Sequence, residues 1–237
     1  MDRTCTSRPG RSRPVAVTMA LLLAATPLAA PLAAQLGERA GDPLGSRVER
    51  AVDMLRAHQD TSGVAGLSAA IAVDGRLVWA GGFGHASVQQ AAEAGPEMVS
   101  RVGSISKPIA AVAAMALWDE GKLDLDAPIT TYLPDYPAAN GGITLRQLMS
   151  HTAGVRHYRD DEFLSNQRYD DVMSPLTVFW QDSLLFEPGT EYSYSTYGWT
   201  VVSAVTEAAD GERTWVAILR DEVIGPLGLV HLQPEWQ

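Results

Sequence analysis

The sequence predicts an α+β protein in which a small antiparallel sheet precedes a mostly helical body. Two β-like runs, residues 66–73 and 76–82, are joined by Asp74-Gly75, a dipeptide typical of a two-residue hairpin turn. From Ser104 onward, apolar runs of helical length alternate with capping residues, prolines and glycines. Because two strands alone form only a marginal sheet, we expect the strands that would complete it to be missing from this sequence.

The first 34 residues have the organisation of a secretory signal. Four arginines come before an apolar stretch over residues 15–30, and small residues up to Ala34 offer a cleavage site before Gln35. The apolar stretch is too short, and too broken by Pro27, for a comfortable membrane span. We therefore expect export to the periplasm or the extracellular space with cleavage near Ala34. Membrane attachment would require the segment to be retained.

After this signal we expect a flexible lead-in over residues 35–45 and one domain over residues 46–237. Within the domain, residues 46–100 form the sheet part and residues 101–237 the helical lobe. Capping residues, prolines and apolar periodicity predict the following elements in order: a helix over 46–58, strands over 66–73 and 76–82, a loop over 84–96, an extended segment over 98–103, a helix from 104 to about 119, a short helix from 126, and helices over 145–149, 175–185, 199–209 and 213–223.

The most informative stretch is Ser104-Ile105-Ser106-Lys107 at the start of an apolar run. Pro108 fits a helix only in its first turn, where a missing N–H costs nothing. Gly121 is a natural C-terminal cap for what we expect to be a buried helix. Ser104 is therefore predicted at or next to the N-cap, and Lys107 one turn on, on the same face.

This spacing would bring a nucleophile and its activator together. A serine hydroxyl is a poor nucleophile until a neighbour accepts its proton. A lysine at a helix start is disfavoured in its charged form by desolvation and by the helix dipole, so its amine can act as a base. A serine three residues before a lysine occurs by chance about once in a chain of this size, but here Lys107 and Lys122 are the only lysines.

Charge and cysteine content exclude several classes of function. The net charge is −10, and removal of the signal with its four arginines and Asp2 would lower it to −13. Such acidity argues against a nucleic acid or an anionic membrane as partner. Cys5 is the only cysteine, so the exported product would have no disulfide and no thiol nucleophile.

A second cluster of aromatic and hydroxyl residues occupies positions 188–199, just before a helix. It is either an aromatic-lined loop over the core or a segment that points a tyrosine and a hydroxyl toward Ser104. Together with the Ser104 motif, it resembles the serine β-lactamase and penicillin-binding-protein superfamily, in particular class C β-lactamases and related esterases, D-aminopeptidases and the mitochondrial β-lactamase-like serine protein. The matching stretches are Gly103–Pro108, Gly121–Pro128, Leu148–Tyr158 and Tyr194-Ser195-Thr196.

The resemblance covers residues 45 to 230 and implies roles for four residues. Ser104 would be the acylated nucleophile, with its backbone N–H in the oxyanion hole. Lys107 would be its proton acceptor or would tune Tyr194, which would deliver a proton to the leaving group. Whether Lys107 or Tyr194 is the base for acylation stays open. Thr196 would contact substrate in a place where asparagine is usual.

The sequence also departs from the family pattern at its end. No Lys-Thr-Gly or His-x-Gly motif follows position 196. In the family this motif lies on a later strand that supplies an oxyanion donor and neighbours for the sheet. The chain therefore resembles a C-terminally truncated member.

We expect no metal or other cofactor. His151 and His157 are six residues apart, which fits no common metal-binding spacing. We interpret His151 as a structural hydrogen-bonding residue in its turn.

The first functional hypothesis is an exported serine hydrolase that forms an acyl-enzyme on a small-molecule or peptide substrate: an amide, peptide, ester or β-lactam. The alternative is a non-catalytic member of the fold that binds peptidoglycan fragments or a partner protein. A third is a membrane-anchored scaffold.

Overall fold

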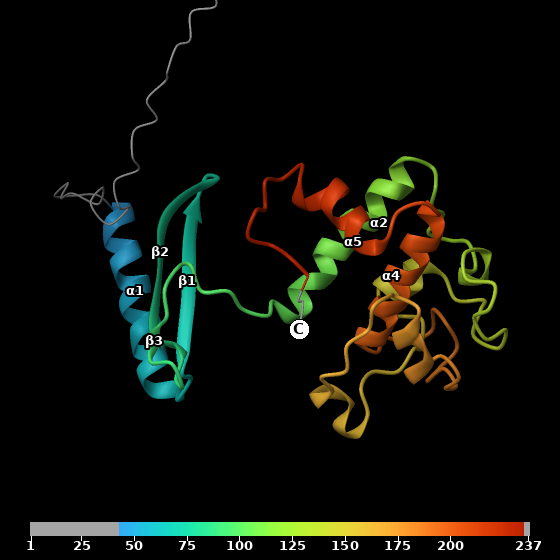
Figure 1. Ribbon diagram of the computed structural model, residues 1–237, viewed down its shortest axis with the longest axis horizontal. Helices are drawn as coiled ribbons and strands as arrows, with labels where there is room; N and C mark the ends of the chain where they lie inside the picture. Colours follow the sequence, from blue (N-terminus) through green and yellow to red (C-terminus); the bar gives the residue numbers. More distant parts are fainter. Residues whose placement is uncertain (1–42, 235–237) are drawn as a thin grey trace, which may run out of the picture. The chain divides into compact units, whose positions relative to one another are not determined.

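The computed structural model describes residues 43–234 and has the predicted α+β class. Its contacts divide the chain into two compact units, one ending at Met98 and the other beginning at Val99 (Figure 1). We call them the N-terminal unit and the C-terminal unit and describe each by itself. The predicted signal and most of the predicted lead-in lie outside the described residues.

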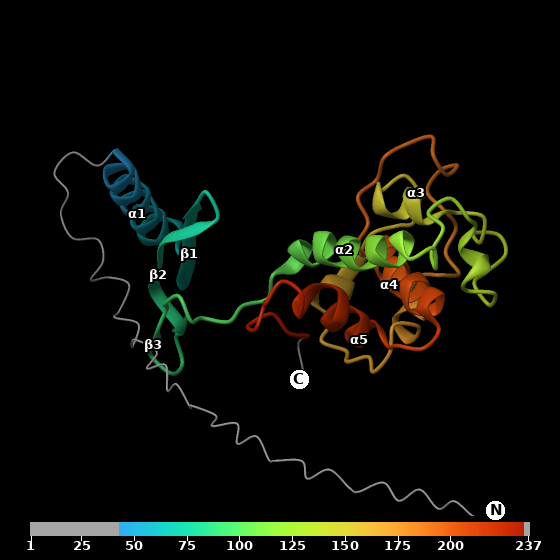
Figure 2. The same cartoon turned by 90° about the horizontal axis from the view of Figure 1, so that it is seen from above.

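The N-terminal unit consists of one helix and a three-stranded antiparallel sheet in the order β1-β2-β3. Helix α1 (Pro43–Ser62) lies beside the hairpin of β1 (Gly66–Val73) and β2 (Arg76–Ser87) in both cartoon views (Figures 1 and 2). The predicted turn is confirmed. Asp74 and Gly75 have φ values of 51° and 72°, the left-handed pair that a type I′ turn requires.

Two boundaries in this unit differ from the prediction. Helix α1 begins at Pro43, inside the predicted lead-in, because proline is well tolerated in the first turn of a helix. The predicted loop over 84–96 contains the end of β2 and a short strand, β3 (Ala92–Glu93). Gly82 allows the chain to fold back here, since a Cβ at this position would lie 2.6 Å from the carbonyl oxygen of Ala94.

The C-terminal unit has its core between helices α2 (Ser106–Asp119) and α4 (Thr196–Asp210), with α5 (Trp215–Leu219) packed against both (Figure 2). Helix α5 continues as a π-helical turn over Arg220–Ile224. The short helix α3 (Leu145–Met149) also packs on α4. Fully buried side chains from these elements and from the segments that connect them form one cluster: Leu117, Ile129, Ile143, Leu145, Leu148, Leu176, Val201, Val202, Val205, Ile218 and Val223.

Local sequence signals account for the ends of several of these helices. The Thr144 side chain accepts from the Gln147 amide while the Gln147 side chain accepts from the Thr144 amide, which is the reciprocal capping box at the start of α3. At the end of α2, the Gly121 amide bonds the Trp118 carbonyl and the Lys122 amide bonds the Leu117 carbonyl. With Gly121 at φ +74°, this is a Schellman cap, and it confirms the predicted helix end.

Helix α2, expected from the sequence to be a buried helix, is buried on one face only. Ala110, Ala113 and Leu117 face the core, whereas Val112 and Trp118 are about half exposed. The residues of the C-terminal unit alone therefore leave one apolar side of this helix uncovered.

The predicted helix over 175–185 is wrong beyond its first turn. The chain forms a 3₁₀ turn over Ser174–Val178 and is irregular afterwards. Three of its carbonyl groups accept hydrogen bonds from side chains that are distant in the sequence. The Asn140 amide donates to the carbonyls of Trp180 and Asp182, and Arg156 donates to the carbonyl of Val178. These long-range bonds replace the i to i−4 ladder of a helix.

No helix within residues 43–234 combines the length and the apolar character needed to cross a membrane.

Candidate active site

Three side chains predicted from the sequence meet in the C-terminal unit. The Ser104 Oγ lies 2.7 Å from the Tyr194 hydroxyl oxygen, and the Lys107 ammonium donates to the same Oγ at 3.1 Å. Lys107 also donates to the Thr196 Oγ1 at 3.3 Å, so all four predicted site residues belong to one hydrogen-bonded group. Residues about 90 positions apart in the sequence are thereby brought to one oxygen atom.

Ser104 lies next to the N-cap of α2, as predicted. Ser104 lies in a 3₁₀ turn, Gly103–Ile105, and α2 begins only at Ser106 with Ile105 as its N-cap. Gly103 has φ +52°, a conformation that favours glycine, so the residue before the serine sets the direction of the turn. Ser104 is solvent-exposed and Lys107 is half-buried. A substrate can therefore reach the serine, and the lysine stem is held by its surroundings.

Lys107 acts on Tyr194 by two routes. Its Nζ lies 4.8 Å from the centroid of the Tyr194 ring, within the range of a cation–π contact. Hydrogen bonding by Lys107, and next by Ser104, lowers the pKa of Tyr194 below its ordinary value of 10.0. The tyrosine that touches the serine is thus shifted toward its phenolate form.

The tyrosine is held by the start of helix α4. Ser195, which is only 3% exposed, is the N-cap, and its Oγ accepts from the Gly198 amide at 2.9 Å. The same hydroxyl donates to the Arg156 carbonyl at 2.7 Å. The cap therefore fixes the residues on both sides of it, Tyr194 and Thr196.

The rings of His151 and His157 both lie next to the ring of Tyr194. The His151 ring lies 4.4 Å from the Tyr194 ring, centroid to centroid, and the His157 ring lies 5.6 Å away, edge on. From the sequence, His151 was interpreted only as a structural residue, and His157 was assigned no role in the site. Their shared signal was their place in the Leu148–Tyr158 stretch, which carries the family resemblance.

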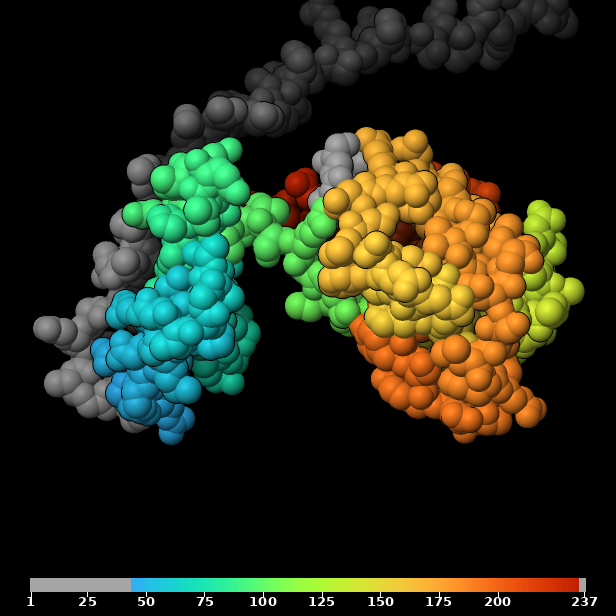
Figure 3. Space-filling view, turned by 90° about the horizontal axis from the view of Figure 1, so that it is seen from below, coloured from blue at the N-terminus to red at the C-terminus, as the bar shows by residue number. Residues whose placement is uncertain are grey.

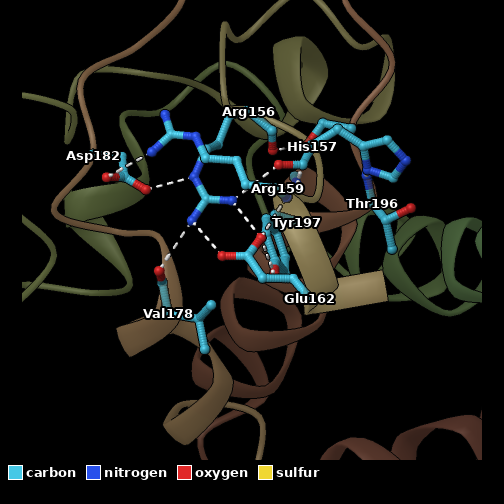
Figure 4. A network of polar contacts seen from close by, with 10 residues as sticks. Arg156, His157, Arg159, Glu162, Val178, Asp182, Thr196 and Tyr197 are labelled. Carbon is cyan, nitrogen blue, oxygen red and sulfur yellow. Dashed lines mark hydrogen bonds and ion pairs between the residues drawn. The ribbon is translucent and has the colours of Figure 1, made fainter. Parts of the chain in front are cut away.

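Arg156 lies between His151 and His157 in the sequence. Its side chain binds the segment that follows, up to Asp182 (Figure 4). Arg156 is 5% exposed, and its guanidinium binds the Glu162 carboxylate at 2.7 and 3.0 Å and the Asp182 carboxylate at 2.5 Å. This arginine holds the pKa of Glu162 at about 2, aided by bonds from the Arg159 amide and the Tyr197 hydroxyl. Figure 3 shows this segment, yellow to orange, at the surface of the C-terminal unit. Sequence reasoning missed Arg156 because its partners lie 6 and 26 positions away.

His151 and His157 bind backbone amides through their Nδ1 atoms. No group of three or more histidine, cysteine or carboxylate side chains in residues 43–234 is arranged to hold a metal ion.

A serine and a lysine three positions apart at a helix start, with a tyrosine bonded to the serine, define a protein of the serine β-lactamase and penicillin-binding-protein superfamily. The family model described as Beta-lactamase matches residues 51–233. The chain belongs to this family.

Among curated proteins, the chain is 28% identical to the human serine beta-lactamase-like protein LACTB, mitochondrial, over 69% of this chain and 43% of that protein. Among solved structures, it resembles EstCE1, a hydrolase with promiscuous acyltransferase activity, at 30% identity and a TM-score of 0.64 over 77% of this chain and 52% of that one. A class C β-lactamase at 19% identity has a TM-score of 0.69 over 83% of this chain and 54% of that one, and so shares the fold. The chain thus spans about half the length of these relatives.

Proposed function

We propose that this chain carries the nucleophilic site of a serine hydrolase that forms an acyl-enzyme on Ser104. The observation that carries the proposal is the double contact of one oxygen atom: the Ser104 Oγ is bonded by the Tyr194 hydroxyl at 2.7 Å and by the Lys107 ammonium at 3.1 Å. A serine held between a proton acceptor and a cation is the arrangement that nucleophilic catalysis requires.

Tyr194 is the proton acceptor in this proposal. It makes the shorter contact to Ser104, and its pKa is lowered by Lys107, whereas Lys107 donates its own protons to Ser104 and Thr196. The Ser104 proton passes to the Tyr194 phenolate as Oγ bonds to the carbonyl carbon of the substrate. The carbonyl electron pair moves to its oxygen.

When this tetrahedral adduct collapses, the leaving group departs and takes the proton from Tyr194. The products are an ester on Ser104 and a free amine or alcohol. A water molecule then attacks the ester after giving its proton to Tyr194, and that proton returns to Ser104 as the acid is released. Lys107 keeps the phenolate available, and the Thr196 hydroxyl is placed to contact the substrate.

The substrate class is an acyl donor such as an amide, a peptide, an ester or a β-lactam. The likeness to EstCE1, described as a hydrolase with promiscuous acyltransferase activity, supports acyl transfer through Ser104. Export follows from the signal predicted over residues 1–34, and a mature N-terminus at Gln35 in protein secreted by a bacterial host would support it.

The test is covalent labelling with a fluorophosphonate and with a fluorescent penicillin, read by intact mass. Labelling of the parent chain should be lost in Ser104→Ala. Ser106→Ala is the matched control, because Ser106 is also exposed and lies two residues away. Loss of labelling in the control, or equal labelling of Ser104→Ala and parent, would refute the assignment. A parent chain that binds these reagents without covalent labelling would instead favour the non-catalytic alternative.

A further inference from the structure

Two imidazoles bind two consecutive backbone amides beside the nucleophile. The Ser195 amide donates to the His151 Nδ1 at 3.1 Å, and the Thr196 amide donates to the His157 Nδ1 at 3.2 Å. Figure 4 shows the His157 ring next to Thr196. These amides belong to the first residues of the α4 terminus, where backbone N–H groups have no partner within the helix. The histidines therefore satisfy donors that would otherwise be free.

The contacts specify the protonation state of both rings. Nδ1 accepts a hydrogen bond only when it carries no proton, so each ring must be neutral with its hydrogen on Nε2. A charged imidazole is a donor at both nitrogens. Protonation would therefore place an N–H against the N–H of Ser195 or Thr196 and break the contact.

The surroundings of His151 favour its neutral form. The groups that face it are Lys107 from α2, His157 from its own segment, and the phenols of Tyr192 and Tyr194. Partial burial, then the charge of Lys107, and then His157 lower the pKa of His151 below 6.5. Lys107 thus bonds the nucleophile and also acts on the histidine through its charge.

His157 has a similar environment. Lys107 and the phenols of Tyr158 and Tyr194 face it. Partial burial and the charge of Lys107 lower the pKa of His157 below 6.5.

The backbone of His151 supports the same arrangement. Its φ is +62°, an uncommon left-handed conformation for a residue with a side chain. In this conformation its carbonyl accepts from the Ser193 amide at 2.9 Å while its ring accepts from the Ser195 amide. One residue thus holds the chain on both sides of Tyr194, and strain of this kind is typical of functional segments.

We propose that His151 and His157, in their neutral forms, are positioning residues that fix Tyr194 against Ser104 and Thr196 against Lys107, and that they release both residues on protonation. Neither histidine touches the reacting atoms. The expected effect on acylation rests on the proposed function. The hydrogen bonds of the two histidines to the Ser195 and Thr196 amides do not depend on it.

The first experiment tests only the hydrogen bonds between the two histidines and the backbone amides, by NMR of the full ¹⁵N-labelled chain between pH 8 and 4.5. Both histidines should be in the Nε2–H tautomer at pH 8. The Ser195 and Thr196 amide signals should shift with midpoints below 6.5, together with the imidazole signals. Their hydrogen exchange, corrected for its intrinsic pH dependence, should become faster by roughly fivefold, the factor expected for one lost hydrogen bond. Nδ1–H tautomers would overturn the proposal. So would Ser195 and Thr196 amide signals that do not change as the histidines titrate.

The second experiment measures the rate of fluorophosphonate labelling against pH in matched variants. The double variant His151→Asn, His157→Asn keeps an oxygen acceptor near each Nδ1 position, and asparagine tolerates the left-handed φ of His151. His151→Gly and His157→Leu remove the acceptors. Exposed His231→Asn is the control and should match the parent at every pH.

The ratio of the parent rate to the double-asparagine rate should be constant above pH 7 and should fall below pH 6. The variants without acceptors should label on the order of 10–100-fold more slowly at pH 8, the usual scale for a misplaced catalytic group. A ratio that is independent of pH, or acceptor-free variants that label as fast as the asparagine ones, would refute a positioning role. Absence of labelling in the parent would refute the proposed function, and the NMR result would then decide the histidine contacts alone.

Discussion

At the scale of single residues, the site depends on how Lys107 changes Tyr194. The lysine bonds the nucleophile, the first residue of α4 and the face of the tyrosine ring. Each contact is modest: a hydrogen bond to a charged group contributes about 1.5–3 kcal/mol, and a cation–π contact about 0.5–2 kcal/mol. Their common result is a tyrosine whose pKa is lowered, and this result has a measurable signature in the pH dependence of acylation.

We predict that the rate of Ser104 labelling rises with pH and levels off with a midpoint below 10, because the phenolate of Tyr194 is the reactive form. Lys107→Met removes the cation and should move this midpoint upward, toward the ordinary tyrosine value of about 10. Tyr194→Phe should lower the rate at pH 8 by at least ~100-fold, the usual scale for a lost general base. Stopped-flow labelling at varied pH measures all three.

Tyr192→Phe is the control, since that phenol is 68% exposed and lies two residues away. A midpoint that stays in place in Lys107→Met would show that the lysine does not tune Tyr194. Labelling of Tyr194→Phe at the parent rate would remove the tyrosine from the mechanism and favour Lys107 as the base.

The sequence predicted these four site residues because all of them lie in short stretches with local signals. The Ser104-to-Lys107 spacing is a single helical turn, and Tyr194 and Thr196 lie in a hydroxyl-rich segment before a helix. The contacts of His151 and His157 could not be predicted in this way. They depend on where a loop meets a helix terminus about 40 positions later, and no local pattern encodes that meeting.

At the scale of elements, the site is supported by the segment from Arg156 to Asp182. Sequence periodicity predicted a helix at its end, but the structure uses the carbonyl groups there to bind Arg156 and Asn140 instead. The helix over 145–149 and the hairpin at Asp74-Gly75 were predicted correctly because neighbours in sequence determine them. Local propensity gives a wrong prediction for segments whose backbone groups form hydrogen bonds with distant side chains.

We predict that Arg156→Met destabilises the C-terminal unit by about 3–5 kcal/mol, because it leaves the carboxylates of Glu162 and Asp182 without their buried partner. Urea unfolding followed by circular dichroism measures the change. Arg146→Met is the control: Arg146 forms a two-bond pair with Asp126, but both side chains are more than half exposed, so the change should be much smaller. Equal effects of the two substitutions would contradict a special role for Arg156.

At the scale of the whole molecule, the two units differ in how much apolar surface they bury. Within the described residues, Val48 is the only buried apolar side chain of the N-terminal unit, and all others belong to the C-terminal unit. All four proposed catalytic and substrate-contacting residues also lie in the C-terminal unit. Because apolar burial is the main favourable term in folding, the N-terminal unit has little to stabilise it by itself.

We therefore expect the N-terminal unit to open at a lower free energy than the C-terminal unit. In native-state hydrogen exchange, amides of β1 and β2 should exchange faster than those in the centres of α2 and α4. Limited proteolysis should cut first within residues 99–102, which are irregular and exposed, and leave the C-terminal unit protected. The buried Ala113 and Val201 are suitable reporters for the helices, and Ala70 is suitable for the hairpin. Exchange of all three amides at one common rate, together with loss of both units at a single protease concentration, would show that the chain unfolds as one cooperative body.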